Sequence, residues 1–399
     1  MHYRLYSLLG LLFFLLFTVA RPSFAFEDPR TIPNNKYGIH IVNEADLGTA
    51  ARLVNSNGGD WGYVTVVIPL AERNVEKWNR IFQEFRRLHL IPLVRLATKP
   101  IGNLWEPAGL KDIDSWAEFL SSLSWVTKNR YIILFNEPNH AKEWGGYLSP
   151  EEYADILIHY SAALKQKSED FFILPAGLDA SAPNGAETMD EREFLARMIE
   201  HNPLLFSSID GWTSHSYPNP GFSGRADKRG RGSLATYEWE LELLSEYGIK
   251  KNFPVFITET GWAHQEGIYA NPSYLPAESV AKEIEIAASS VWSDPRIIAI
   301  TPFILNYQSY PFANFSWQRP GEDEFYPQFD TYQELAKAKG EPSLALTPTL
   351  IPSAILGLST KSNFSGVMNS PPSRPSFFQS LIRQLTSFPV VSKFISSAI

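Results

Sequence analysis

One pattern recurs along the chain and limits what it can fold into: a short apolar run, a turn-rich loop, and a stretch with helical periodicity. Eight such runs lie between Lys36 and Lys339, and their near-continuous hydrophobicity is typical of strands that a parallel sheet buries on both faces. The runs cover residues 37–42, 62–69, 91–97, 131–138, 171–179, 209–218, 254–262 and 297–308. Eight alternating units predict an α/β fold of the (β/α)8 TIM barrel type, whose usual size is about 250 residues.

The segments between the strands contain helix signals. Ser149 is a predicted N-cap, Pro150 suits the first helical position, and Glu152 is placed to close a capping box. Further helices are predicted over residues 112–123, 190–201, 235–248, 276–292 and 330–339. A doubly wound open sheet is the structural alternative, but no G-x-G-x-x-G motif follows the first strand and the chain has no P-loop.

The two ends of the chain differ from its middle. Residues 1–25 have the basic start, apolar core and small-x-small site of a signal peptide, so we expect an exported protein; an uncleaved membrane anchor is the alternative. Residues 26–340 form the predicted barrel, and residues 341–399 are a Ser- and Pro-rich tail or linker. Apolar residues near the C-terminus suit an amphipathic helix that packs back on the barrel or docks on a partner or membrane.

Charge and cysteine content exclude several classes of function. Residues 1–25 hold two basic and no acidic residues and residues 341–399 hold four basic and one acidic, so the net charge of −8 becomes −13 over residues 26–340. Such a surface repels nucleic acid and favours a neutral partner. The chain has no cysteine, no H-E-x-x-H and no G-x-S-x-G, which disfavours disulfides, thiolate metal sites and a serine esterase.

Two carboxylates stand at predicted strand ends. Glu137 ends the fourth strand within FNEPN, where Pro138 should hold it extended, and Glu259 ends the seventh strand within ITETGW, 122 residues later. That separation is three βα units, so the barrel should place the two glutamates face to face at its mouth. Because both cannot ionise freely, one pKa should rise. A protonated acid beside an ionised carboxylate is what cleavage of a glycosidic bond needs.

With these motifs the chain, over residues 36 to about 340, resembles the clan of retaining glycoside hydrolases that have (β/α)8 barrels and catalytic glutamates on strands 4 and 7. The resemblance implies that Glu137 is the general acid/base and Glu259 the nucleophile. It also implies that Asn136 binds the sugar 2-hydroxyl, and that His215 and Tyr217 at the end of strand 6 hold the nucleophile and the sugar. Alternatively, His215 and Tyr217 only satisfy one another in a polar core.

Other candidates for substrate binding follow from their positions. Arg95 ends the third strand and could steady Glu259, although many clan members carry the comparable arginine on strand 2; a structural ion pair is the alternative. His40, at the end of the first strand, is either a ligand contact or a structural partner. Tryptophans in or beside the loops offer flat apolar faces for sugars or pack in the core. They are Trp105, Trp144, Trp212, Trp262 and Trp317, with Trp262 ranked first.

Strand 8 departs from the clan pattern because it lacks the tryptophan that usually lies beneath the reacting sugar. Phe303, Tyr307 or Trp317 would have to replace it. The prediction is therefore a cofactor-free retaining hydrolase of β-linked neutral oligo- or polysaccharides, with any membrane contact confined to an uncleaved N-terminal segment or the C-terminal tail. A non-catalytic glycan-binding barrel on the cell surface is the alternative. The sugar, the linkage, exo or endo action and the oligomeric state stay open.

Overall fold

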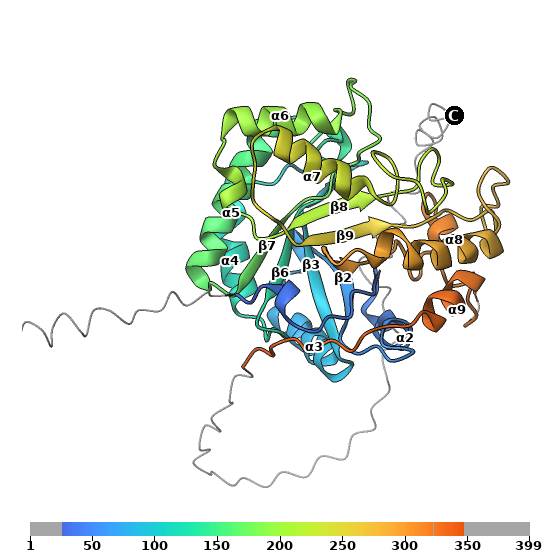
Figure 1. Ribbon diagram of the computed structural model, residues 1–399. Coiled ribbons are helices and arrows are strands. Elements are labelled where there is room, and N and C mark those ends of the chain that lie inside the picture. The colour runs from blue at the N-terminus through green and yellow to red at the C-terminus, as the bar shows by residue number, and fades with distance from the viewer. Residues whose placement is uncertain (1–25, 322, 347–399) are drawn as a thin grey trace, which may run out of the picture.

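The computed structural model describes residues 26–321 and 323–346. Within them, eight parallel strands alternate with α-helices, and the helices surround the strands (Figure 1). The barrel strands are β1 (Gly38–His40), β2 (Gly62–Pro69), β3 (Leu90–Ala97), β6 (Arg130–Leu134), β7 (Phe171–Pro175), β8 (Trp212–Ser216), β9 (Val255–Thr260) and β10 (Ile297–Ile300). The helices are α2 (Leu47–Val54), α3 (Val75–Arg87), α4 (Ile113–Ser121), α5 (Pro150–Lys167), α6 (Glu191–His201), α7 (Thr236–Glu246), α8 (Ala277–Ser289) and α9 (Pro327–Glu334).

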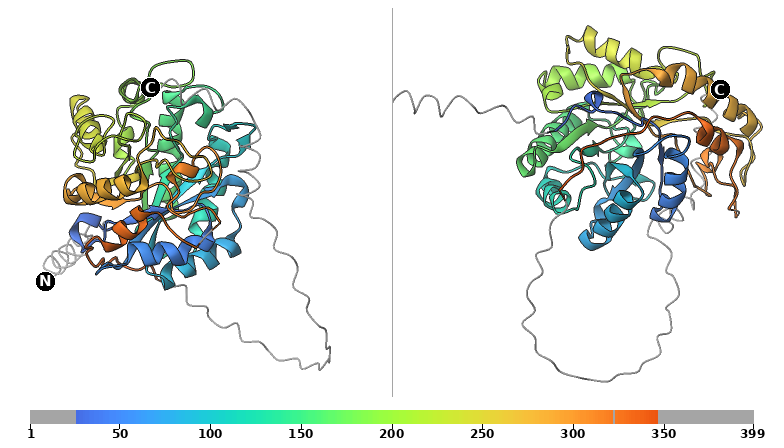
Figure 2. Two further views of the ribbon diagram at one scale, coloured as in Figure 1. Left: turned by 90° about the vertical axis from the view of Figure 1, so that its right-hand side faces the viewer. Right: turned by 60° about the horizontal axis from the view of Figure 1, so that its bottom comes forward.

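Hydrogen-bond pairing closes the strands into a barrel. Five strands pair in the order β1-β2-β3-β6-β7 and three in the order β10-β9-β8, all parallel. Parallel bridges between Tyr37 and Ile300 and between Asp179 and His215 join the two sets at both seams. The predicted (β/α)8 barrel is therefore confirmed: each predicted run contains a strand, although several strands end earlier than predicted. The C-terminal ends of β8 and β9 point to the right in Figure 1, and the left view of Figure 2 looks onto that face.

The barrel interior is filled rather than hollow. Aromatic rings from four strands pack against one another, because large side chains bury the most apolar surface and fill the taper of a closed barrel. Tyr131 is central, with ring centroids 5.0 Å from Phe172, 5.4 Å from Phe256 and 6.1 Å from Tyr63. Nearer the mouth, the interior becomes polar, as Thr65 donates a hydrogen bond of 2.9 Å to Thr301. The reactive groups lie beyond this layer.

Several local details differ from expectation. Ser149 caps α5 as predicted, yet Glu152 closes no capping box: its Oε2 accepts from the Trp144 indole at 3.1 Å and the Tyr147 hydroxyl at 2.8 Å. These donors from the preceding loop take the carboxylate away from the helix end. The last helix is shorter than predicted because Leu335 leaves helical geometry. A small antiparallel hairpin of β4 (Pro100–Ile101) and β5 (Leu104–Trp105), which no sequence pattern indicated, follows β3.

Beyond residue 340, the predicted end of the barrel, the chain continues along the face opposite the C-terminal ends of the strands. Glu341 N donates to Pro33 O at 2.9 Å, and Ala345 N donates to Val126 O at 3.1 Å. None of the helices in the described part of the chain combines the length and apolar character that a membrane span requires. The predicted signal peptide of residues 1–25 and the predicted C-terminal helix lie outside the described residues.

Candidate active site

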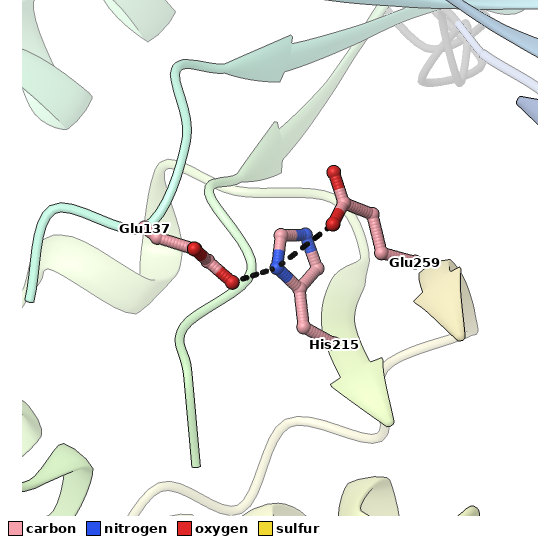
Figure 3. Close-up of side chains that lie close together, drawn as sticks. All are labelled: Glu137, His215 and Glu259. Atoms are coloured by element: carbon pink, nitrogen blue, oxygen red, sulfur yellow. Dashed lines mark hydrogen bonds and ion pairs between the residues drawn. The ribbon is translucent and has the colours of Figure 1, made fainter. Parts of the chain in front are cut away.

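The mouth of the barrel brings together side chains from three strand ends. Glu137 follows β6, His215 belongs to β8, and Glu259 belongs to β9. Figure 3 shows His215 between the two glutamates, with Nδ1 lying 2.8 Å from Oε1 of Glu137 and 3.9 Å from Oε2 of Glu259. A carboxylate oxygen of each glutamate and a ring nitrogen of His215 all lie within 4.8 Å of one another. The barrel thus places the two glutamates face to face.

The backbone at Glu137 is not extended as Pro138 led us to expect. Strand β6 ends at Leu134, and Phe135 and Glu137 adopt φ angles of 75° and 31°. Residues with side chains rarely occupy this left-handed region, and those that do cluster at functional sites. Backbone hydrogen bonds hold the turn, because Glu137 N donates to Gly177 O at 3.2 Å and His140 N donates to Glu137 O at 2.9 Å. The strained turn re-aims the Glu137 carboxylate toward His215.

The Glu259 carboxylate is held by donors on both oxygens. A guanidinium N–H of Arg95 donates to Oε1, and the Tyr217 hydroxyl donates to Oε2 at 3.0 Å. The same Arg95 nitrogen donates to Oδ1 of Asn136 at 2.7 Å, so one cation orients both side chains. Burial alone would raise the pKa of Glu259, but the positive charges of His215 and Arg95 lower it to about 2. The surroundings of Glu259 therefore keep its carboxylate ionised.

The pKa values of the two histidines of the site are shifted in opposite directions. Burial lowers the pKa of His215, but the charges of Glu259 and Glu137 outweigh it and raise that pKa above its ordinary value. His40 is buried, neither of its ring nitrogens has a hydrogen-bond partner, and Nδ1 lies 4.0 Å from Oε1 of Glu259. Burial and the charge of Arg95 lower the pKa of His40 to about 3, so it is neutral. Because protein encloses both of its ring nitrogens, His40 in this structure is a neutral neighbour of the Glu259 carboxylate and offers no exposed group to a ligand.

The two tryptophans predicted to bind substrate, Trp262 and Trp317, lie in the core of the barrel. Trp262 and Trp317 are almost completely buried, so neither can present a ring face to a sugar. Trp262 donates its indole N–H to Gly224 O at 2.8 Å, and Trp317 packs edge-on against Tyr332 of α9. Their prediction as substrate-binding residues is wrong, because a position beside a loop does not fix which way a side chain points. The aromatic ring that lies against the site is Phe303, whose centroid is 5.2 Å from that of His40.

Sequence reasoning missed a polar pair beside Glu137. Nε2 of His140 lies 2.9 Å from Oδ2 of Asp179 in the loop after β7. Asn139, fully buried between the same loops, donates to Asp179 O at 3.0 Å and to Met189 O at 3.1 Å. These contacts fix the loop that bears Glu137 against the loop after β7. The sequence contains only one hint of this contact, which is that His140 follows Glu137 by three residues.

The same three groups could in principle bind a cation. Among the residues that the structure describes, Glu137, His215 and Glu259 are the one set that offers three ligand atoms close together. The guanidinium of Arg95 already occupies Oε1 of Glu259, however, and a metal ion there would lie beside another positive charge. The site is therefore poorly suited to a metal ion.

Comparison with known proteins agrees with the barrel. No protein-family model and no curated protein matches the chain. Among solved structures, a β-xylosidase from Caulobacter crescentus matches with a TM-score of 0.51 and 13% identity, over 79% of this chain and 74% of that one. A glucosidase from Croceicoccus marinus matches with a TM-score of 0.52 and 11% identity, over 77% and 68% of the two chains. This protein shares their barrel fold. At such low identity the likeness shows the fold alone.

Proposed function

We propose that the protein is an exported glycoside hydrolase that cleaves β-linked neutral glycans with retention of anomeric configuration. The observation that carries this proposal is the pair of opposed glutamates, with oxygens within 4.8 Å of each other. Carboxyl groups about 5–5.5 Å apart suit a retaining enzyme, whereas an inverting enzyme needs about 6.5–9.5 Å to admit a water molecule. The structurally similar β-xylosidase and glucosidase support the same class of reaction.

In the first step Glu137 gives its proton to the glycosidic oxygen as the bond to the anomeric carbon breaks. Glu259 attacks that carbon, and a covalent glycosyl-enzyme forms. The environments match these roles: Glu259 is held ionised by Arg95 and Tyr217, while Glu137 is the more exposed side chain, at 17% against 10%. Exposure matters because Glu137 must meet both the leaving group and the incoming water.

In the second step water enters on the side that the leaving group has left. Glu137, now ionised, takes a proton from that water, and the resulting hydroxyl attacks the anomeric carbon and releases Glu259. His215 faces both carboxylates and stabilises whichever is charged at each stage. Asn136 accepts from Arg95 through Oδ1, so its amide N–H groups are left to donate to the sugar 2-hydroxyl.

The decisive experiment compares the purified chain with Glu137→Gln and Glu259→Gln on aryl β-glycosides and a panel of neutral polysaccharides. We expect release of reducing ends by the parent, loss in both variants, and the β-anomer as the first product in proton NMR spectra. An α-anomer first product would overturn retention. If the protein binds a glycan but cleaves none, the result would instead support the non-catalytic glycan-binding barrel. The presence of Phe303 in place of the expected tryptophan favours this alternative.

A further inference from the structure

A row of aromatic rings leads from the nucleophile to the surface. His40 lies beside Glu259, Phe303 packs edge-on against His40, and Phe312 packs edge-on against Phe303 with centroids 5.3 Å apart. Phe312 is 39% exposed and therefore ends this row in solvent. Packed rings thus connect the exposed Phe312 with the buried group beside Glu259.

A second exposed ring lies in the neighbouring loop. Tyr269, in the loop between β9 and α8, is 45% exposed and packs against Tyr310, with centroids 5.9 Å apart. Tyr310 and Phe312 belong to the loop after β10. We call Tyr269, Tyr310 and Phe312 the aromatic rim. Single exposed apolar residues are common, but several rings from two loops beside a reactive centre indicate a binding surface.

The loops that form the aromatic rim are tied together by a buried amide. The side-chain nitrogen of Asn314 donates to His264 O at 2.9 Å and to Tyr269 O at 3.0 Å. Because Asn314 follows Phe312 by two residues, this side chain fixes one loop against the other. The rings are therefore ordered before any ligand arrives, which reduces the conformational entropy lost on binding.

The charge of these segments indicates the chemistry of the ligand. Residues 268–276 and 303–318 contain no Asp, Glu, Lys or Arg, although 20% of the chain is charged. They contribute amides and hydroxyls instead, from Asn271, Asn306 and Gln308 among others. Flat apolar faces among neutral hydrogen-bonding groups match a sugar ring, which has C–H faces and hydroxyl edges. A nucleic acid or an acidic polymer would find no cation in these two segments.

We infer that the aromatic rim binds further sugar residues of the substrate, and that the natural substrate is a neutral polysaccharide or long oligosaccharide. This inference rests on the proposed function of the site. The rim adjoins the nucleophile through His40 and Phe303, whereas the leaving group departs at Glu137. It therefore contacts the sugars that stay on Glu259 in the glycosyl-enzyme.

The test uses aryl β-glycosides that share one leaving group and carry one to five sugar residues on the glycosyl side. For the parent, kcat/KM should rise with length, and Tyr269→Ala and Phe312→Ala should each lose about tenfold on the long substrates and little on the shortest. Leu204→Ala, which truncates an exposed apolar side chain remote from the barrel mouth, is the matched control. Tyr269→Trp should preserve the dependence on length because it keeps a ring at this position.

The outcomes separate the two proposals. If the parent turns over its substrates and neither rim variant changes kcat/KM at any length, the aromatic rim does not bind sugar residues. The proposed function would then remain intact. Equal loss on short and long substrates would also overturn the aromatic rim, since that result indicates damage to the site. If the parent cleaves no glycoside, affinity electrophoresis in gels that contain neutral polysaccharide decides: retardation that Tyr269→Ala weakens supports the rim, and unchanged mobility overturns it.

Discussion

The hydroxyl of Tyr217 lies 3.0 Å from Oε2 of Glu259 and donates to an oxygen that Arg95 does not contact. This donor stabilises the ionised carboxylate, and in the proposed mechanism it is released as that oxygen forms a bond to the sugar. A hydrogen bond to a charged group contributes about 1.5–3 kcal/mol. The pair of donors explains how a carboxylate can stay ionised while almost completely buried.

Tyr217→Phe should therefore lower kcat/KM by about 10- to 100-fold. Loss of the donor raises the pKa of Glu259, so the acidic limb of the pH profile should move to higher pH. Steady-state kinetics measure both effects over a pH range that begins at about pH 2, where Glu259 of the parent titrates, and ends at pH 8. Tyr274→Phe removes a hydroxyl from a half-buried tyrosine of the same aromatic cluster and serves as the control. An acidic limb that stays in place would show that Tyr217 does not act through Glu259.

Two substitutions of Arg95 distinguish the effect of its positive charge from the effect of its hydrogen-bond geometry. Arg95→Gln removes the cation that lowers the pKa of Glu259, so the acidic limb should move further upward than in Tyr217→Phe, with a loss of about 10²-fold or more. Arg95→Lys keeps the charge but loses the paired contact with Glu259 and Asn136. It should retain the acidic limb of the parent while still losing activity. Identical pH profiles for the two variants would contradict an electrostatic role.

Substrates with different leaving groups distinguish the proposed roles of Glu137 and Glu259. Glu137→Gln removes the proton donor, so substrates with poorly acidic leaving groups should lose about 10²- to 10⁴-fold, while activated aryl glycosides still react with Glu259. Because the second step then lacks its base, the glycosyl-enzyme should accumulate, and intact-protein mass spectrometry should show one added glycosyl unit. Glu259→Gln should show no added mass with any substrate. An adduct in Glu259→Gln would place the nucleophile elsewhere.

The barrel could be predicted from the sequence because its signals are local. Buried parallel strands are almost uniformly apolar, and each of the eight runs is followed by a helical pattern. Counting those units also placed Glu137 and Glu259 at facing strand ends. Arg95 and Tyr217 could be placed near Glu259 for the same reason, since strand ends meet at one mouth.

Side-chain direction in loops could not be predicted in the same way. Trp262 follows β9 by two residues, yet its ring turns into the core because Gly224 O offers a partner for its indole N–H there. The positive φ of Glu137 is accompanied by a hydrogen bond from its N–H to Gly177 O, which lies 40 residues away in the sequence. The pairing of His140 with Asp179 likewise joins two loops that no local pattern connects. These features depend on tertiary contacts.

Stability should depend on pH through a second pair of acids, which lies behind β8. Glu191 begins α6 and Glu240 belongs to α7, and both are fully buried. Trp212 Nε1 and Ser214 Oγ donate to Glu240 at 2.8 and 2.9 Å, and the Glu191 carboxyl is its acidic neighbour. Burial raises the pKa of Glu240 to about 7, and burial together with the charge of Glu240 raises that of Glu191.

A carboxyl group whose pKa is higher in the folded state keeps its proton after the unfolded chain has lost it. The contribution of Glu240 to the free energy of unfolding should therefore fall by about 3 kcal/mol as pH rises from about 4.5 to about 7, and Glu191, whose pKa is also raised, adds to the decline. Glu191→Gln removes one acid and lets its amide donate to Glu240, so the decline should flatten. Urea unfolding at pH 5, 6, 7 and 8 measures this. Glu193→Gln, an exposed position on the same helix, should keep the parent's slope. An equal slope in Glu191→Gln would show that Glu191 does not influence the titration of Glu240, and a flat curve for the parent would show that the buried pair holds no proton.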